Sequence, residues 1–340
     1  MAYTTINKST AHFNTKLYNG TGSSNSITGV GFQPDFTWIK RRNSATNHHL
    51  HNAISGATKV LYSNSNAAES TDAQKLSSFD SDGFTVGTNG DANNSSGTFA
   101  SWNWKANGAG SSNTDGSINS TVSVNTTAGF SIVSYTGTSA NATVGHGLGA
   151  VPKMMIFKNR SSSYAWPVYH VGIGATKYMY LSTTDAAGTF SGHFQDTAPS
   201  SSIITLGSDV SVNSGNMIAY CFAEKTGYSK FGSLTGNGST DGTFVYCGFA
   251  PAFIIVKAIT SGNWFMYDNK RPGYNNVQQF LEADGNAAEY TSNANHSIDI
   301  VSNGFKFTGG SGSNTAGREC IFMAFGQSLV GSNNVPCTAR

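Results

Sequence analysis

The sequence is poor in charge, because Asp, Glu, Lys and Arg make up only 11% of its 340 residues. Ordinary soluble proteins carry about 25% charged residues. The formal net charge is +2, so Lys and Arg supply no large excess for a general nucleic-acid surface. Apolar runs approaching the roughly 20 residues of a membrane-spanning helix are also missing. We therefore expect no nucleic-acid partner and no membrane insertion.

Cysteine is scarce, with four residues, and no two of them have CxxC spacing. Cys221, Cys247 and Cys320 lie among apolar strand residues, and Cys337 lies near the end of the chain. We expect buried, reduced thiols, although an even number leaves one or two disulfides open. The N-terminal segment MAYTTINKSTAHF has no apolar core of signal-peptide length, so we expect no export signal.

Residues that carry catalysis or hold metals do not recur in any pattern. GxSxG and GxxxxGK[ST] motifs are absent, as are paired carboxylates at matching places in the repeats described below. His48, His49 and His51 lack a nearby acidic partner, so a polar turn or a surface patch competes with a zinc site. Asp91 lies in NGDANNSSG, which lacks the terminal glutamate of a calcium loop. We predict a non-enzymatic protein without metal or cofactor.

Glycine, with 39 residues, and aromatic residues, at 12%, are abundant, and Ser, Thr and Asn fill the spaces between short apolar runs. Segments such as FSIVSYTG (130–137) and FVYCGF (244–249) are typical of half-buried strands. SDGF and SNGF place hairpin turns before strands. The pattern predicts an all-β protein with helix below about a tenth of the residues, against an average near a third.

One apolar phrase occurs three times, as QPDFTWIK, VPKMMIFK and APAFIIVK, each with a proline six residues before a lysine. A turn glycine precedes each proline by 14 or 15 residues, and a later apolar strand follows it by 70 to 74 residues. The repeated positions are Gly20, Gly137 and Gly236; Pro34, Pro152 and Pro251; Lys40, Lys158 and Lys257; and Trp104, Phe222 and Phe325. Each proline is expected to begin a strand, and each lysine to end it at the surface with a solvated head. The alternative is that the lysines contact a ligand.

These repeats predict three tandem β-sandwich units of jelly-roll-like character. The units span 1–106, including an N-terminal arm, 128–226 and 231–327. A Gly/Ser/Asn linker is expected at 107–127 and a C-terminal tail at 328–340.

Two segments are candidates for binding a ligand or a subunit. A W-x-x-Y phrase with a polar neighbour occurs as Trp166, Tyr169 and His170, and again as Trp264, Tyr267 and Asp268. Because residues three apart on a strand face opposite ways, we expect one aromatic of each pair in the core and the other exposed, where it can stack on a sugar. The alternative is a core tryptophan in each unit. The loop 267–275 adds Lys270, Arg271, Tyr274 and Asn275, which suit a binding loop or a subunit interface.

Several long phrases carry a family resemblance. They are GFQPDFTWIKRRN, FASWNWKANGAGSSNTDGSI, ATVGHGLGAVPKMMIFKNR, YCFAEKTGYSKFGSLTGNGSTDGTFVYCGFAPAFIIVK, SNGFKF and NNVPCTAR. Together they resemble a family of virion structural proteins of marine tailed phages, including phages of cyanobacteria, often described as tail-fibre or tail proteins. The resemblance covers nearly the whole chain, although FGQSLV replaces the more usual FAEQPF in the last unit and Cys320 and Cys337 are unusual.

The resemblance implies a non-enzymatic virion protein that is made in the host bacterial cytoplasm and contacts other phage virion proteins. A tail fibre or spike component that recognises a host surface glycan or receptor is favoured. The alternatives are a capsid decoration or outer virion protein, and a glycan-cleaving spike. Cleavage would need two carboxylates roughly 5–10 Å apart, with Asp268, Glu282 and Asp284 as candidates. Analogy with threefold fibres and spikes favours a homotrimer.

Overall fold

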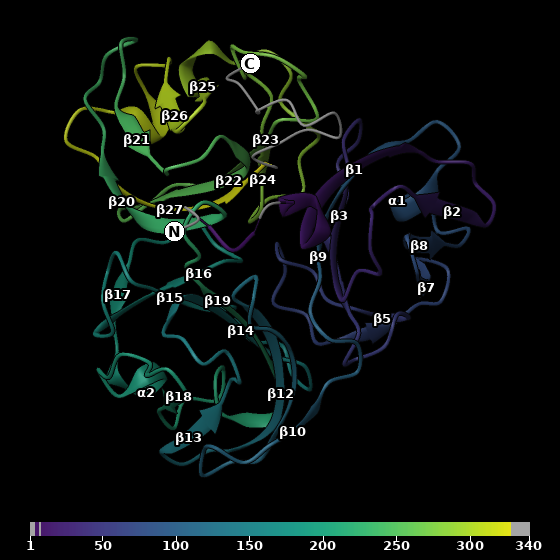
Figure 1. Ribbon diagram of the computed structural model, residues 1–340, viewed down its shortest axis with the longest axis vertical. Coiled ribbons are helices and arrows are strands. Elements are labelled where there is room, and N and C mark those ends of the chain that lie inside the picture. The colour runs from purple at the N-terminus through teal and green to yellow at the C-terminus, as the bar shows by residue number, and fades with distance from the viewer. Residues whose placement is uncertain (1–3, 7, 328–340) are drawn as a thin grey trace.

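Strands arranged in the same order form the main sheet of each of three lobes, which surround a common centre (Figure 1). The structure is a computed structural model that describes residues 4–6 and 8–327. We call residues 8–106, 107–226 and 227–327 lobes 1, 2 and 3. The prediction of an all-β protein is confirmed, since strands hold 44% and helices 5% of the residues.

The main sheets are antiparallel, and each consists of the following strands in spatial order. Lobe 1 has β1 (Phe13–Asn19), β9 (Thr98–Trp104), β3 (Phe36–Arg41) and β4 (His49–Asn52). Lobe 2 has β10 (Ser111–Asn113), β11 (Ser120–Asn125), β12 (Phe130–Thr138), β19 (Ser214–Ala223), β14 (Pro152–Asn159), β15 (Pro167–His170), β16 (Lys177–Tyr180) and β17 (Gly188–Thr189). Lobe 3 has β20 (Ser229–Thr235), β27 (Glu319–Gly326), β22 (Pro251–Ala258), β23 (Trp264–Asp268) and β24 (Leu281–Glu282).

A smaller sheet lies at the outer side of each lobe. These sheets are β2 (Asn25–Thr28), β8 (Gly83–Val86) and β7 (Leu76–Asp80) in lobe 1; β13 (Ala142–Gly145) and β18 (Ile203–Leu206) in lobe 2; and β21 (Phe244–Tyr246), β26 (Gly304–Phe307) and β25 (Ile298–Val301) in lobe 3. The remaining elements are the pair β5 (Lys59–Val60) and β6 (Ser70–Thr71), the helices α1 (Gly90–Asn93) and α2 (Ser191–Phe194), and the 3₁₀ turns Ser9–Ala11, Ala294–His296 and Gly312–Asn314.

The repeated proline phrase has the same pairing register in all three lobes. Pro152 and Pro251 begin β14 and β22, and Pro34 lies two residues before β3. The residue two positions after each proline pairs with the aromatic residue of the long central strand: Phe36 with Trp104, Met154 with Phe222, and Phe253 with Phe325. The constant spacing in the sequence therefore corresponds to a constant register in the sheets.

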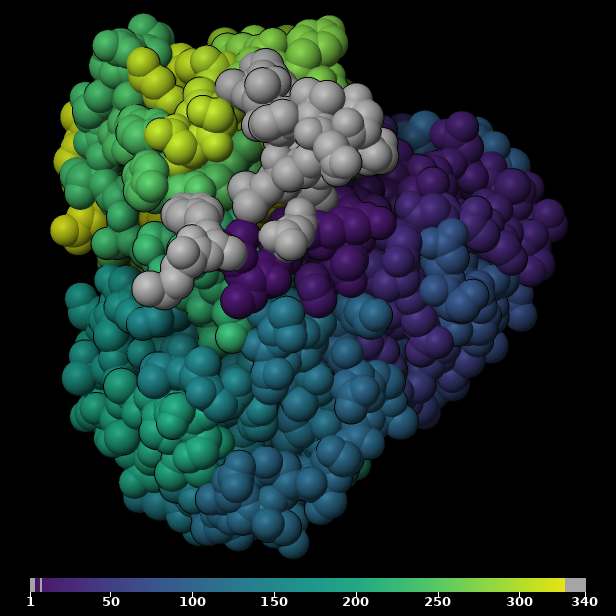
Figure 2. Space-filling view, viewed as in Figure 1, coloured from purple at the N-terminus to yellow at the C-terminus, as the bar shows by residue number. Residues whose placement is uncertain are grey.

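The central strands of each main sheet are buried on both faces, which explains the uninterrupted apolar runs of β14 and β22. One face packs against the small sheet of its own lobe, as where Ile254 of β22 shares a cluster with Phe305 of β26. The other face joins a single core to which all three lobes contribute. At its centre the rings of Trp104, Phe222 and Phe325 form a triangle, with centroids 5.7 to 6.3 Å apart. Figure 2 accordingly shows three lobes in close contact.

The repeated turn glycines are explained by three buried asparagines. The side chains of Asn93, Asn213 and Asn314 each bond to the turn that follows one of these glycines, for example Asn213 Nδ2 to the Ala140 carbonyl at 2.6 Å. A Cβ on Gly137 would come within 2.3 Å of the Asn213 carbonyl carbon. Only glycine allows the asparagine backbone to approach so closely.

Two of the domain boundaries predicted from the sequence need correction. The third unit begins before residue 231, because β20 starts at Ser229. The segment 107–127 is not simply a linker, because β10 and β11 lie within it and extend the main sheet of lobe 2. Ser112 and Ser120 belong to those strands, so a Ser-rich segment can still complete a sheet edge. The predicted C-terminal tail, 328–340, lies outside the described residues. Among the described residues, no helix has the length and apolar character needed to cross a membrane.

Candidate functional site

The repeated lysines lie at the junctions between lobes, and their predicted solvated position is wrong. Lys40, Lys158 and Lys257 are at most 1% exposed. Lys158 Nζ donates to the carbonyls of Tyr164 at 2.7 Å and of Asn66, in lobe 1, at 2.8 Å. A loop of the neighbouring lobe covers the end of each strand, so the ammonium group binds backbone carbonyls in place of water.

The same contact repeats around the ring. Lys257 of lobe 3 donates to the carbonyl of Asp185 in lobe 2 at 3.0 Å, and Lys40 of lobe 1 donates to that of Asn286 in lobe 3 at 3.3 Å. Burial lowers the pKa of each lysine from 10.5 to about 8. The three lysines therefore close a cycle of lobe-to-lobe contacts.

Our sequence reasoning missed the loops that receive these lysines, although the sequence contains a signal for them. Each acceptor is followed by two alanines, in NAA at 66–68, DAA at 185–187 and NAA at 286–288. A leucine precedes each acceptor by four or five residues, at Leu61, Leu181 and Leu281. This second repeated phrase marks the partner side of each junction.

A second cycle of contacts uses the residues that end β4, β15 and β23. Asn52 Nδ2 donates to Tyr220 Oη of lobe 2 at 3.2 Å. His170 Nε2 lies 3.1 Å from the Phe322 carbonyl oxygen of lobe 3, and its Nδ1 accepts from the Gly172 amide. Burial lowers the pKa of His170 to about 4, so the ring is neutral and donates through Nε2. The predicted ligand residue His170 is therefore a junction residue.

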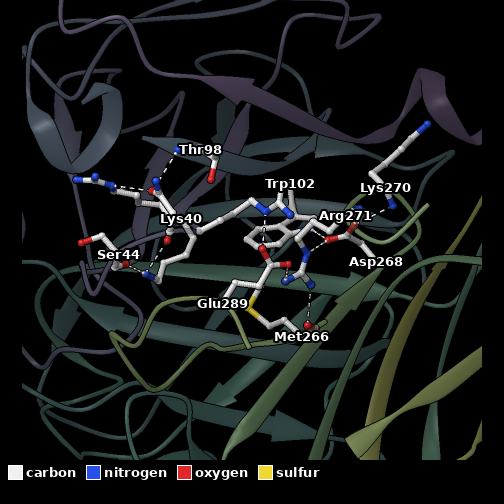
Figure 3. Close-up of polar contacts among 12 residues, drawn as sticks. Lys40, Ser44, Thr98, Trp102, Met266, Asp268, Lys270, Arg271 and Glu289 are labelled. Atoms are coloured by element: carbon white, nitrogen blue, oxygen red, sulfur yellow. Dashed lines mark hydrogen bonds and ion pairs between the residues drawn. The ribbon is translucent and has the colours of Figure 1, made fainter. Parts of the chain in front are cut away.

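Asp268 completes this cycle with a charged network (Figure 3). Its carboxylate accepts from Trp102 Nε1 of lobe 1 at 3.1 Å and from Arg271 Nε at 2.6 Å. Arg271 also donates to the Met266 carbonyl at 2.8 Å and lies 3.3 Å from Glu289. Glu289 in turn pairs at 2.6 Å with Arg42 of lobe 1. The alternating charges join lobes 3 and 1, and the side chains of Asp268 and Arg271 are fully buried.

The W-x-x-Y residues are all buried, so the expectation that one aromatic of each pair is exposed is wrong. The Trp166 indole donates to the carbonyls of Tyr62 and Ser65 in lobe 1, and that of Trp264 donates to the Tyr180 carbonyl in lobe 2. Tyr169 and Tyr267 face the opposite side, toward the small sheet of their own lobe. Both faces of these strands are covered, because each main sheet lies between two layers.

The predicted binding loop 267–275 divides into a buried half and an exposed half. Tyr267, Asp268 and Arg271 belong to the core and its junction. Lys270 is exposed, Tyr274 is 75% exposed, and the Asn275 side chain bonds to the backbone of Ile300. Of the ten predicted candidates, Lys270 and Tyr274 are the ones whose side chains are open to solvent.

The histidines of NHHLHN are buried, which corrects the expectation of a polar turn or surface patch. Burial lowers the pKa of His48 and His49 well below 6.5 and that of His51 to about 4. His48 Nδ1 accepts from Trp38 Nε1 at 2.8 Å. Within residues 4–6 and 8–327, no group of three or more His, Cys, Asp or Glu side chains is placed to hold a metal ion.

Two of the three carboxylates that a glycan-cleaving enzyme would need, Asp268 and Asp284, have structural contacts. Burial raises the pKa of Asp284 to about 6, and burial with the Asp284 charge raises that of Glu282 to about 7. Asp284 Oδ1 accepts from the Trp264 backbone amide at 2.8 Å. In lobe 1, Asn64 Oδ1 accepts in the same way from the amide of His48. A neutral amide thus makes the same contact, which indicates a structural role for Asp284.

A Ser, His and Asp cluster in lobe 2 lacks the geometry of a catalytic triad. Ser211 Oγ and Asp209 Oδ1 both approach the same nitrogen, His193 Nε2, at 3.3 and 3.5 Å. His193 Nδ1 is buried without a hydrogen-bond partner. A triad needs the carboxylate on the nitrogen opposite the nucleophile.

The three described cysteines match the expectation of buried, reduced thiols. Cys221, Cys247 and Cys320 are free and buried. Burial raises the pKa of the Cys221 and Cys247 thiols to about 12 and that of Cys320 to about 11. Cys337 lies outside the described residues.

Comparison with known proteins gives a family but no described activity. No curated protein and no solved structure matches the chain. One family model, described as a domain of unknown function (DUF7483), matches residues 8–328 and so spans all three lobes. The chain belongs to this DUF7483 family.

Proposed function

We propose that this chain is a non-enzymatic structural protein of a tailed-phage particle, and that it is a tail fibre or spike component that contacts the host surface. The resemblance of its long phrases to marine phage virion proteins motivates the proposal. It would be made in the host cytoplasm, would bind other virion proteins, and would need no cofactor. The single observation that carries the non-enzymatic part is the use of the reactive side chains at the lobe junctions.

The junction chemistry supports a scaffold in preference to a catalyst. Lys158, His170 and Asp268 are the types of residue that catalysis uses, yet each is buried and bonded to a neighbouring lobe. A buried charge that is fully hydrogen-bonded fixes geometry but offers no reactive atom to a substrate. Incubation with host surface polysaccharide should therefore release no new reducing ends. If wild type releases reducing ends and the variant Glu282→Gln or Asp284→Asn does not, the glycan-cleaving alternative is established.

We also propose that the three lobes are tandem β-sandwich repeats of jelly-roll-like type. The common strand order and the shared Phe36, Met154 and Phe253 register support a common ancestry. Superposing the lobes on Pro34, Pro152 and Pro251 tests this, because the superposition should bring β9, β19 and β27 together. Superposition that placed these strands at different sheet positions would contradict the proposal.

The place of the protein on the particle needs a direct measurement. Gold-labelled antibody raised against the purified chain should mark the tail tip or fibres of intact phage. Labelling spread over the capsid would instead establish the decoration-protein alternative, and absence of the protein from purified particles would refute a virion role.

The proposed homotrimer is tested separately. One chain already contains three similar lobes, so a monomer also presents three similar surfaces to a partner with threefold symmetry. Light scattering of the purified protein distinguishes one copy from three.

A further inference from the structure

We propose that the outer face of the small sheet of lobe 3 binds a neutral carbohydrate, by stacking sugar rings on Phe244 and Tyr246. This inference deepens the proposed host contact and takes its biological setting from it. The two residues lie on β21, the edge strand of the sheet β21, β26, β25. They are 47% and 60% exposed, whereas Val245 between them is buried. Both rings therefore lie on one face, two residues apart on the strand.

The same position in the other two lobes carries small or hydroxyl side chains. In lobe 1, β2 pairs with β8 as β21 pairs with β26, which aligns Ser26 with Phe244 and Thr28 with Tyr246. There the Ser26 hydroxyl bonds to that of Thr85 at 2.9 Å. In lobe 2 the corresponding strand residues are Thr143 and Gly145. The fold tolerates serine, threonine or glycine at these positions, so the aromatic pair is not needed to build a small sheet.

The charges around the rings favour a neutral ligand. Lys306 pairs in register with Phe244 on one side and Asp299 on the other, and its ammonium group forms an ion pair with Asp241. The positive charge in this row is therefore neutralised, which disfavours a phosphate or a polyanion. The flat C–H face of a pyranose suits an aromatic ring, and the Lys306, Asp241 and Asp299 groups can bind its hydroxyls.

The size of the patch argues against a protein partner. Two rings exposed to this extent offer on the order of 200 Å² of apolar surface. A stable protein interface buries about 800 Å² on each side. The strand β21 has three residues, which is short for pairing with an added strand. A ligand of one or two sugar rings matches this footprint.

The test compares glycan binding by matched variants of the full chain. The probe is an immobilised array of neutral hexose and N-acetylhexosamine oligosaccharides, and affinity for any bound member is then measured in solution. The variant Phe244→Ser/Tyr246→Thr places the lobe 1 side chains at this face. We expect it to lose about tenfold in affinity or more, as removal of two ring contacts predicts, with an unchanged melting temperature. Tyr246→Phe keeps the ring and should bind within a few-fold of wild type.

Tyr274→Ser is the matched control, because it removes the most exposed aromatic of the same lobe, which lies outside the small sheet in the loop between β23 and β24. The proposal is overturned if wild type binds no array member at millimolar concentration, or if the double variant binds as tightly as wild type. It is also overturned if the double variant changes the oligomeric state, which would make the face a contact between copies. Antibody labelling of particles remains independent: glycan binding by a protein absent from the virion would refute the proposed function and leave this site standing.

Discussion

Replacing Asp268 by Asn removes one negative charge from the junction between lobes 3 and 1 and leaves a buried arginine without its closest partner. One carboxylate oxygen accepts from the amides of Lys270 and Arg271, each at 2.9 Å. The other accepts from Arg271 Nε at 2.6 Å and Trp102 Nε1 at 3.1 Å. A carboxamide has one oxygen and one NH₂ group. On one of the two sides the NH₂ group therefore replaces an accepting oxygen and faces hydrogen-bond donors.

The expected loss is large because both partners are buried. Removing one member of a buried ion pair costs about 3–5 kcal/mol, since the remaining charge stays desolvated. Asn52 occupies the same place in lobe 1 as a neutral amide that donates to the Tyr220 hydroxyl and accepts from the Ser55 amide. Ser55 follows Asn52 by three residues, as Arg271 follows Asp268, so the arginine has no counterpart at that position. The cost at 268 therefore arises from Arg271, and not from an amide at this position in itself.

Guanidinium chloride unfolding, followed by tryptophan fluorescence, measures the effect. All five tryptophans are buried, so their emission reports loss of the core and junctions. Asp241→Asn is the control, because it makes the same chemical change in an exposed ion pair and should alter the free energy of unfolding little. The loss in free energy of unfolding of the double variant Asp268→Asn/Arg271→Met should be at least about 1 kcal/mol smaller than the sum of the losses of the two single variants. Additive losses, or a change below about 1 kcal/mol for Asp268→Asn, would refute the proposed coupling.

Three further predictions follow from the junctions and the shared core. Between pH 8 and 10.5 the unfolded chain keeps a proton that folded Lys158 has released. As pH rises through this range, the free energy of unfolding of wild type should therefore increase by up to about 3 kcal/mol relative to that of Lys158→Met, as measured by denaturant unfolding at each pH. A flat difference would contradict this. Between pH 4 and 6 folded Asp284 holds a proton that the unfolded chain has released. As pH rises through this range, the free energy of unfolding of wild type should therefore fall by up to about 3 kcal/mol relative to that of Asp284→Asn. The opposite slope would argue against the burial of this carboxyl. Residues 107–226, which keep β10 and β11, should lack near-UV circular dichroism when expressed alone, because their inner sheet face would lose the cover of the other lobes. A cooperative native signal would show that lobe 2 folds independently.

The sequence predicted the local features well, because they depend on neighbours along the chain. The alternation and turns around Pro152 and Pro251 place β14 and β22 correctly, and their spacing matches the register with Phe222 and Phe325. The low helix content follows from the same short apolar runs.

The junctions could not be predicted in this way, because they join residues far apart in sequence. Lys158 binds the carbonyl of a residue 92 positions away, and Asp268 binds an indole 166 positions away. A strand that ends in lysine has the same local pattern whether water or a neighbouring lobe covers its end. The repeated alanine pairs after Asn66, Asp185 and Asn286 were the available sign that each lobe has a partner loop.

The alternation of FVYCGF likewise predicted a strand but did not show which side is open. Phe244 and Tyr246 stand out only when their positions are compared across lobes. That comparison requires the pairing register, which the structure supplies.

The covalent connection of the three lobes changes how the surface can evolve. In a ring of three identical chains, every substitution appears three times, and a change that weakens a junction weakens all of them at once. Here each position is encoded separately, as the different residues Asn52, His170 and Asp268 at equivalent places illustrate. One lobe can acquire a new outer face while the other two preserve the scaffold, and each chain then presents a single copy of that face.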